Sequence, residues 1–192
     1  MPLPTNGLVA HYEARFESYN NSDDVTSVED QSEEGHDLTE VPNQEPEFVD
    51  DVINGHPVFR GKGDGCRIIR TGVDIQSSEL TIAVLVASDQ EEDTRTWPFT
   101  LHGTGDTGTN QIFAFTEYVD GNGYGVFFRG DSDWQDQDSS TTPDWSLLEV
   151  RWDGNSGEFY KDRTLIAGNS IGHDMEINVI GLLGFNGGGD AK

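Results

Sequence analysis

Short runs of apolar residues, separated by Gly, Pro, Asn and Asp, cover most of this 192-residue chain. No window of 11 residues keeps a 3.6-residue apolar period between these breakers, so the pattern predicts strands rather than helices. Ten short strands with frequent turns are typical of an all-β sandwich or jelly roll. The expected strands lie at 8–12, 57–60, 67–73, 80–87, 111–116, 124–129, 145–152, 158–160, 163–167 and 176–185.

Two of these stretches have informative patterns. The stretch Leu80–Ala87 (LTIAVLVA) is rich in β-branched residues and apolar on both faces, so it is expected to be the most buried strand of the sandwich. The stretch 145–152 alternates instead, which predicts one buried and one wetter face. The buried face would hold Leu148, Val150 and Trp152, and the wetter face Leu147, Glu149 and Arg151.

Residues 18–47 interrupt the strand pattern with a polar, acidic stretch. The length of the chain suits a single domain spanning residues 1–192, because a chain this long can bury most of its apolar surface around one core. Residues 18–47 are then expected to be a long acidic surface excursion of that domain. Its anchoring points would be Val25, Val28, Leu38 and Val41.

Charge narrows the possible partners. The chain has 36 acidic and 11 basic residues, which gives a net charge of −25 at pH 7. Such a field repels phosphate, so binding to nucleic acid or to an anionic membrane surface is not expected. The chain also has no apolar run near the roughly 20 residues that a membrane-spanning helix needs, so no membrane insertion is expected.

The acidic residues are spread along the whole chain, and Arg outnumbers Lys eight to three. An acidic surface with scarce Lys is typical of proteins that work in multimolar salt, where self-repulsion is screened. A haloarchaeal or haloviral origin is therefore expected. The alternative is an unusually acidic mesophilic protein, which would be expected to use more Lys. Below about 0.5 M salt, where the Debye length exceeds roughly 4 Å, the domain should loosen.

Cysteine content and the N-terminus bear on the compartment. Cys66 is the only cysteine, so no disulfide forms within the chain, and it is expected to be a small core residue. Residues Met1–Gly7 lack the basic segment and apolar stretch of a secretory signal, so export by that route is not expected.

Several N-terminal segments occur in a recognisable order. The chain reads Gly7–Ala14 (GLVAHYEA), then Val25–Ser32 (VTSVEDQS), His36–Thr39 (HDLT), Glu47–Asp50 (EFVD) and Ile53–Gly61 (INGHPVFRG). This order resembles the concanavalin A-like lectin/glucanase superfamily in its laminin-G-like form. The resemblance implies a two-sheet antiparallel jelly-roll sandwich.

Later segments extend the resemblance to about Phe185. They are Leu80–Ala87, Glu158–Ala167 and Ile180–Gly184. Members normally end in a further strand that pairs near the N-terminal strand, but here the closing strand is apparently missing before Lys192. An open sheet edge is a pairing hazard. Either the chain is part of a longer protein or, as we expect, it forms an assembly in which a neighbouring subunit fills the edge.

The sequence does not predict an enzyme. Glucanases of the superfamily use two carboxylates about 5 Å apart, written E-x-D-x-x-E on one strand, and this chain has no such string. The nearest approximations, Glu149–Asp153 and Glu117–Asp120, end in Asp-Gly turns, which explain their aspartates better than catalysis does.

Metal binding is a more open question. Asp131, Asp133, Asp136 and Asp138 have spacings that could surround Ca²⁺, which prefers six to eight oxygen ligands. The segment lacks the sixth-position Gly and the final Glu of an EF-hand loop. Related laminin-G domains often bind calcium in rim loops, so the resemblance implies Ca²⁺ as a possible cofactor. The alternative is a solvated acidic loop.

Glycan binding is the common activity that the resemblance implies, through an exposed aromatic ring stacked on a sugar. Trp134 within the acidic segment and Trp97 before Pro98 are the candidates, because Trp145 and Trp152 fit a core strand. An anchor in a subunit interface is the alternative role for Trp134.

These expectations combine into one functional hypothesis. A lectin-like sandwich without catalytic carboxylates or an export signal suggests a virion structural or host-recognition protein of a halophilic archaeal virus. It would be a capsid decoration, turret or tail-fibre subunit on the virion surface, and it would contact homo-oligomer partners, neighbouring virion subunits and possibly host-surface glycans. The alternative is a carbohydrate-binding module of a larger haloarchaeal surface protein or glycoside hydrolase, located at the extracellular cell surface. A glycosidase is a third, weaker hypothesis.

Overall fold

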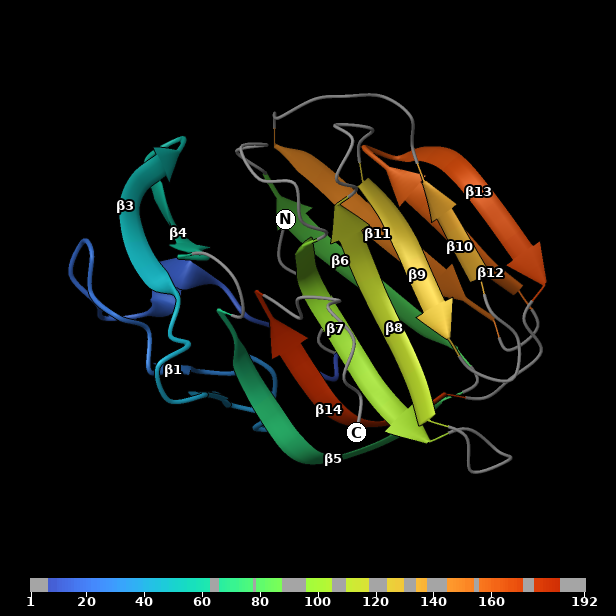
Figure 1. Cartoon of the computed structure of the whole chain (residues 1–192), viewed down its shortest axis with the longest axis horizontal. Helices are drawn as coiled ribbons and strands as arrows, with labels where there is room; N and C mark the ends of the chain where they lie inside the picture. Colours follow the sequence, from blue (N-terminus) through green and yellow to red (C-terminus); the bar gives the residue numbers. More distant parts are fainter. Residues whose placement is uncertain are drawn as a thin grey trace.

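Two antiparallel β-sheets form the body of the protein in the computed structural model (Figure 1). The structure describes residues 7–62, 66–77, 79–87, 96–104, 110–117, 124–129, 134–137, 145–153, 156–170 and 175–183. Its described helical content is a single 3₁₀ turn, η1 (Ala14–Phe16), and no described helix is long and apolar enough to cross a membrane.

The larger sheet has eight strands, in the order β1-β2-β5-β14-β7-β8-β9-β10. Its strands are β1 (Ser27–Val28), β2 (Leu38–Glu40), β5 (Ile68–Ser77), β7 (Thr96–Thr104), β8 (Asn110–Glu117), β9 (Tyr124–Arg129), β10 (Trp134–Gln137) and β14 (Met175–Leu182).

The smaller sheet has four strands, in the order β13-β12-β11-β6. They are β6 (Leu80–Val86), β11 (Ser146–Trp152), β12 (Ser156–Lys161) and β13 (Thr164–Ser170). The chain moves from the large sheet to the small one after β5 and β10, and returns after β6 and β13. All of these pairings are antiparallel, and the predicted two-sheet jelly-roll sandwich is confirmed.

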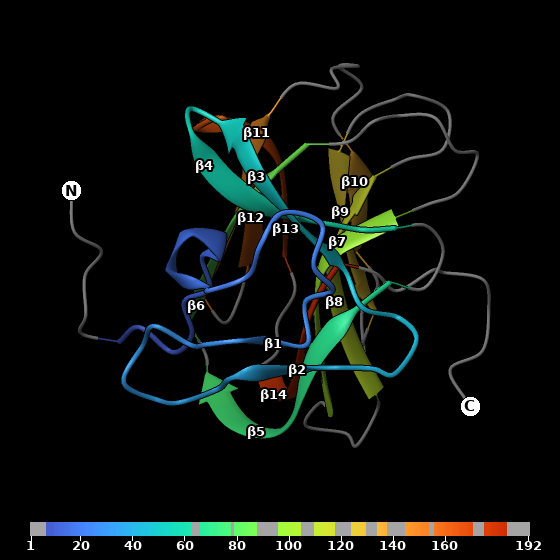
Figure 2. The same ribbon diagram turned by 90° about the vertical axis from the view of Figure 1, so that its left-hand side faces the viewer.

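A hairpin of two strands, β3 (Glu47–Ile53) and β4 (His56–Arg60), lies beside η1 at one end of the sandwich (Figure 2). Ile53 pairs with His56, so Asn54 and Gly55 are the two turn residues. Both have positive φ, 51° and 78°. This is the backbone of a two-residue hairpin turn, which Asn-Gly adopts readily.

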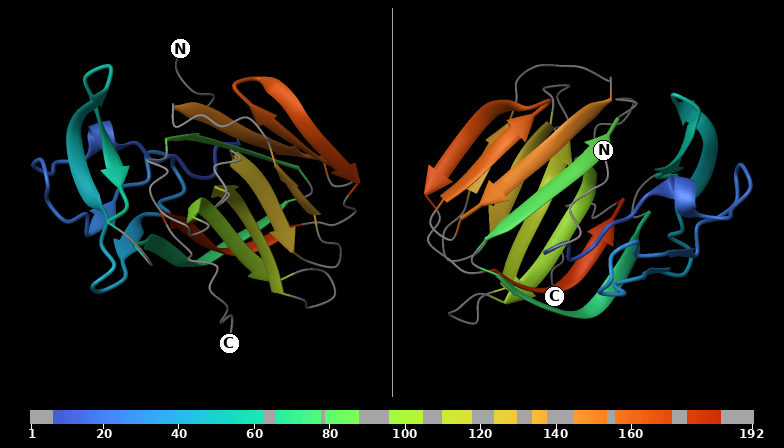
Figure 3. Two further views of the ribbon diagram at one scale, coloured as in Figure 1. Left: turned by 45° about the horizontal axis from the view of Figure 1, so that its top comes forward. Right: turned by 180° about the vertical axis from the view of Figure 1, so that it is seen from behind.

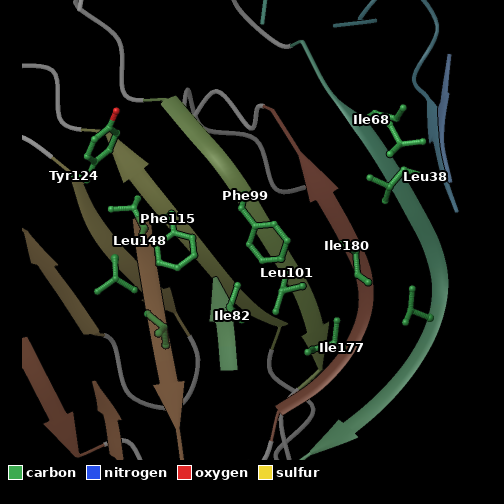
Figure 4. Packing of buried hydrophobic residues seen from close by; sticks show 14 of the residues in the cluster. Leu38, Ile68, Ile82, Phe99, Leu101, Phe115, Tyr124, Leu148, Ile177 and Ile180 are labelled. Carbon is green, nitrogen blue, oxygen red and sulfur yellow. The ribbon is translucent and has the colours of Figure 1, made fainter. Parts of the chain in front are cut away.

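Aromatic rings join the two sheets in the core (Figure 4). Phe115 in β8 lies 6.3 Å from Phe99 in β7 and 6.3 Å from Phe159 in β12, measured between ring centroids. Phe115 and Phe159 are fully buried. The alternation predicted for β11 is also confirmed, because the side chains of Leu148, Val150 and Trp152 are all buried. Cys66 is a buried residue, as expected.

The prediction that Leu80–Ala87 is the most buried strand is wrong. β6 is the outer strand of the small sheet, and only β11 pairs with it among the described residues. Ile82 faces the core, whereas the side chain of Leu85 is 53% exposed. A strand apolar on both faces therefore lies at a sheet edge, where one of its faces contacts water.

The strand expected at Leu8–Tyr12 is also absent. The segment is bonded along one side to the loop that follows β1: Gln31 donates its backbone N–H to the carbonyl of His11 at 2.8 Å, and the Ser32 hydroxyl donates to the carbonyl of Val9 at 3.2 Å. No described strand borders its other side. The segment therefore lacks the ladder that defines a strand.

The Asp30 carboxylate holds this loop together. One oxygen accepts the backbone N–H groups of His11 and Ser32, and the other accepts the His36 N–H and the Ser32 hydroxyl. Burial alone would raise the pKa of Asp30, but these hydrogen bonds outweigh burial and lower it. Asp30 is thus a buried, ionised anchor for the N-terminal segment.

Replacing Asp30 by Asn is expected to lower the free energy of unfolding by about 2 kcal/mol at pH 7, because an amide nitrogen would face two of the four donors. Since the folded-state pKa of Asp30 is lowered, its ionisation stabilises the fold at pH values above the unfolded pKa of about 3.9. The difference between the two proteins should therefore shrink as the pH falls through the lowered pKa.

Urea unfolding across this pH range measures the difference. Glu33 is an exposed acid in the same loop, and its replacement by Gln is the matched control. A loss no larger for Asp30→Asn than for Glu33→Gln would contradict the anchoring role.

The acidic stretch 18–47 is closely joined to the sandwich. Val25, Val28 and Leu38 have no exposed surface. β1 pairs with β2, and β2 pairs with β5, so the stretch contributes two strands to the large sheet. Three of the four expected anchoring residues are therefore core residues.

Candidate functional site

The structure leaves the predicted site residues largely untested. Trp97 is in β7 and Trp134 is in β10, but their side chains lie outside the described residues. Of the predicted calcium ligands, Asp131, Asp133 and Asp138 lie outside the described residues, as does the side chain of Asp136.

The loop interpretation of the acidic segment is wrong for Trp134–Gln137. These four residues form β10, an edge strand paired with β9, since their backbone groups complete the ladder of the large sheet. Among the described residues, no group of three or more potential metal ligands occurs. Calcium binding at this segment remains a prediction.

The described residues bring a different polar group together, on the outer face of the small sheet. We call this surface the open face, and it is turned toward the viewer in the right-hand view of Figure 3. Cross-strand pairing aligns its side chains in rows. One row holds Ala83, Glu149, Tyr160 and Leu165, and the next holds Thr81, Arg151 and Glu158.

Local sequence explains this alignment. β11 and β12 alternate buried and more exposed residues, and a turn at Asp153 joins them. The Asp153 carboxylate accepts the backbone N–H of Ser156 at 2.7 Å, which confirms that this aspartate is a turn residue. The turn sets the register in which Glu149 lies opposite Tyr160 and Arg151 opposite Glu158.

A short network links four polar side chains of the open face: Glu149, Arg151, Glu158 and Tyr160. Arg151 Nε donates to Glu149 Oε1 at 2.6 Å, and the Tyr160 hydroxyl donates to Glu158 Oε2 at 2.6 Å. The Arg151 guanidinium lies over the Tyr160 ring, 4.6 Å from its centroid. Each of these contacts holds a neighbouring side chain in place, so the network presents a defined surface.

The network also affects protonation. The hydrogen bond to Glu158 raises the pKa of the Tyr160 hydroxyl, and the bond to Glu149 raises the pKa of Arg151. At neutral pH the open face therefore offers a phenol, a guanidinium with several N–H donors, and two carboxylates whose remaining lone pairs accept hydrogen bonds. These groups suit a neutral, hydroxyl-rich ligand that both donates and accepts.

The sequence contained part of this site. The predicted wetter face of 145–152 includes Glu149 and Arg151, and the expected strand 158–160 includes Glu158 and Tyr160. The signal that could have identified the site is the turn sequence Asp-Gly-Asn-Ser-Gly after Trp152, which predicts that the strands on either side of it pair, and this pairing places the four side chains on one face. The aromatic residues expected from the sequence to bind glycan were Trp134 and Trp97, and Tyr160 was not among them.

Comparison with known proteins adds little beyond the architecture. No family model and no curated protein matches the chain. Among solved structures, the chain is similar to the carbohydrate binding module CBM66 from Bacillus subtilis, with 12% identity, a TM-score of 0.43, and coverage of 72% of this chain and 88% of that one.

The chain is also similar to an endo-beta-1,3-glucanase from Pyrococcus furiosus, with 11% identity and a TM-score of 0.44. That match covers 76% of this chain and 65% of the glucanase. Structural similarity at such low sequence identity does not indicate an activity, because activity depends on the residues of the site itself.

Proposed function

We propose that this chain is a non-enzymatic domain that binds carbohydrate through its open face. The observation that supports the proposal is the Tyr160 ring held within the network of Arg151, Glu149 and Glu158 on an exposed sheet. A sugar presents hydroxyls that donate and accept hydrogen bonds, and apolar C–H faces that pack on an aromatic ring. The open face offers a complement to both.

A binding role fits these carboxylates better than hydrolysis does. Glycoside hydrolysis needs one carboxyl group poised as an acid and a second as a nucleophile or base. Glu149 accepts a hydrogen bond from the Arg151 guanidinium, and Glu158 accepts one from the Tyr160 hydroxyl. Both groups therefore act as acceptors.

Replacing Tyr160 by Ala is expected to weaken glycan binding by at least about tenfold, because it removes both the ring and the donor to Glu158. A glycan array in multimolar salt would identify the ligand, and calorimetry with that glycan would measure the affinity. Leu165→Ala on the neighbouring strand is the matched control, since Leu165 is exposed on the same face outside the network.

Two results would contradict the proposal. One is the absence of binding to any glycan by the unaltered protein. The other is equal affinity in the Tyr160 and Leu165 variants together with a loss in Trp134→Ala, which would place the binding surface at β10 instead.

We also propose the setting in which this domain works. The net charge of −25 with scarce Lys supports function in multimolar salt. The finer hypothesis is a virion surface protein of a halophilic archaeal virus, of the concanavalin A-like superfamily, that assembles with neighbouring subunits and contacts host-surface glycans. The alternative is a carbohydrate-binding module of a larger haloarchaeal surface protein or glycoside hydrolase. Neither setting involves nucleic acid or membrane insertion, and Ca²⁺ stays a proposed cofactor.

A further inference from the structure

The edge of β6 away from β11 has no strand partner among the described residues, and its sequence is unusual for an edge strand in so acidic a chain. Leu80–Val86 contains no charged residue, no proline and no register shift against β11. Proteins usually protect an edge strand with one of these features, because its unpaired N–H and C=O groups attract another strand. β6 has none of these protections, so its edge is suited to pairing.

A second unpaired edge belongs to the segment Leu8–Tyr12. The carbonyl groups of Val9 and His11 accept hydrogen bonds from the 31–32 loop, and the N–H of His11 donates to Asp30. In extended chain the backbone groups of Leu8, Ala10 and Tyr12 point to the opposite side. They form no backbone hydrogen bond with another described residue.

The segment Leu8–Tyr12 lies on the side of β6 opposite to β11 (Figure 3, right-hand view). Its side chains still belong to the sandwich, because Ala10 and Tyr12 pack against the core. Two unpaired edges therefore flank the same part of the small sheet.

The strands that face one another across the sandwich show what lies opposite the interval between these two edges. β13 contacts β10, Phe159 in β12 packs on Phe115 in β8, and Ile82 in β6 lies beside Leu101 in β7 (Figure 4). Beyond β7 the large sheet continues with β14 and then β5. Tyr12 interacts with Arg70 of β5. Of β7, β14 and β5, which follow one another in the large sheet, only β14 is therefore left without a facing segment among the described residues, and this leaves one strand position open.

Arg70 supplies an independent sign of a missing partner. It follows Ile68 by two residues in β5, so its side chain leaves the sheet on the same inner face, and it lies opposite Ile180 of β14. Its Nε is buried and has no hydrogen-bond partner in the part of the chain that the structure describes. Buried donors are nearly always satisfied in proteins, so an acceptor is missing here.

We propose that the interval between β6 and Leu8–Tyr12 is a docking site for one extended strand donated by a neighbouring polypeptide. The donated strand pairs with β6 on one side and with Leu8, Ala10 and Tyr12 on the other. It covers β14 with apolar side chains and places an acceptor, preferably a carboxylate, at Arg70.

The geometry favours a single donated strand over direct pairing of β6 between two copies of this chain. A second copy would bring its whole small sheet edge to edge with β6, where Leu8–Tyr12 and the loop at Asp30–Ser32 already lie. It would also bring together two chains of charge −25. A single strand fits between the two edges without either conflict.

The test extends the full chain after Lys192 with a donor strand, Val-Thr-Glu-Thr-Val-Thr-Val, on a flexible Gly-Ser linker, because tethering gives the strand a high effective concentration. Its Val residues and its Glu share one face, so both can point toward β14 and Arg70. The matched control carries the same extension with two of its Val residues replaced by Pro, which cannot complete the ladder. Relative to this control, the donor is expected to raise Tm by roughly 5 °C or more. Amide exchange should slow by at least about tenfold in both Leu80–Val86 and Leu8–Tyr12.

Arg70→Gln separates the charge contribution from backbone pairing. In the unextended chain this change is expected to leave Tm unchanged or slightly higher, because it removes a donor that has no partner. In the chain that carries the donor strand, Arg70→Gln should reduce the rise in Tm that the donor produces. It should have no such effect when the Glu of the donor is replaced by Gln.

Two outcomes would overturn the proposal. In the first, donor and proline control have the same Tm and the same exchange rates. In the second, the unextended chain sediments as a dimer with protected β6 amides, which would make a second copy the occupant. These readouts are independent of glycan binding, so either idea can fail without the other.

Discussion

Replacing Gly103 by Ala is expected to destabilise the chain by at least about 3 kcal/mol, a large effect for the addition of one methyl group. Gly103 lies in β7 and pairs with Ile177 of β14, directly beside a register shift in β14. A Cβ at this position would overlap the carbonyl oxygen of Glu176 and lie 2.6 Å from its carbonyl carbon.

These atoms belong to the backbone of the neighbouring strand, so no side-chain rotation can relieve the overlap. The pairing of β7 with β14 in the middle of the large sheet would have to open. Gly168→Ala in β13 is the matched control: the nearest atom to its added Cβ is 3.6 Å away, so we expect less than about 1 kcal/mol of change. Chemical denaturation of both variants measures the difference, and equal midpoints would show that β14 can shift freely.

Gly103 also illustrates what local sequence cannot predict. β7 was not among the expected strands, because Pro98 and Gly103 interrupt its pattern. In the structure these two residues are accommodated by register shifts, one in the pairing of β7 with β8 and one in its pairing with β14. Glu176, whose carbonyl requires the glycine, lies far along the chain, and no local pattern contains that information.

The strands that were predicted correctly have a clear apolar and polar pattern within their own residues. β11 alternates cleanly, and β9 spans 124–129, as expected. Such patterns reveal which face of a strand is buried, but not whether a neighbour covers its edge. For that reason β6 was expected at the centre of a sheet and lies at its edge, and Leu8–Tyr12 was expected to be a strand and has no ladder.

The candidate site, too, was predictable only where the pattern of a single strand determines it. The alternation in β11 predicted that Glu149 and Arg151 would be on a wetter face, which holds. The choice of Trp134 and Trp97 as the glycan-binding aromatics came from residue type and from the polar sequence around them. Tyr160 belongs to the site because of the β11–β12 register. This register pairs Tyr160 with Glu149 and brings the Arg151 guanidinium over the Tyr160 ring. In a chain with 36 acidic residues, composition could not single out two of them.

The second large effect is expected for the three packed rings of Phe99, Phe115 and Phe159, which join the two sheets. Phe159 contributes a ring from the small sheet, packed on Phe115, and its side chain has no exposed surface. Replacing Phe159 by Ala is expected to lower the free energy of unfolding by about 3 to 5 kcal/mol, since it removes the buried ring and leaves a cavity beside Phe115.

Urea unfolding in multimolar salt measures this loss, with Leu165→Ala as the control. Leu165 lies in β13, next to Tyr160 of β12, but its side chain is 53% exposed, so its replacement should change stability by less than about 0.5 kcal/mol. The contrast tests the sandwich itself, because Phe159 gains its burial only when β12 packs across β8. Similar losses for the two variants would mean that the small sheet does not close on the large one through this ring, and the position of the open face would then be wrong as well.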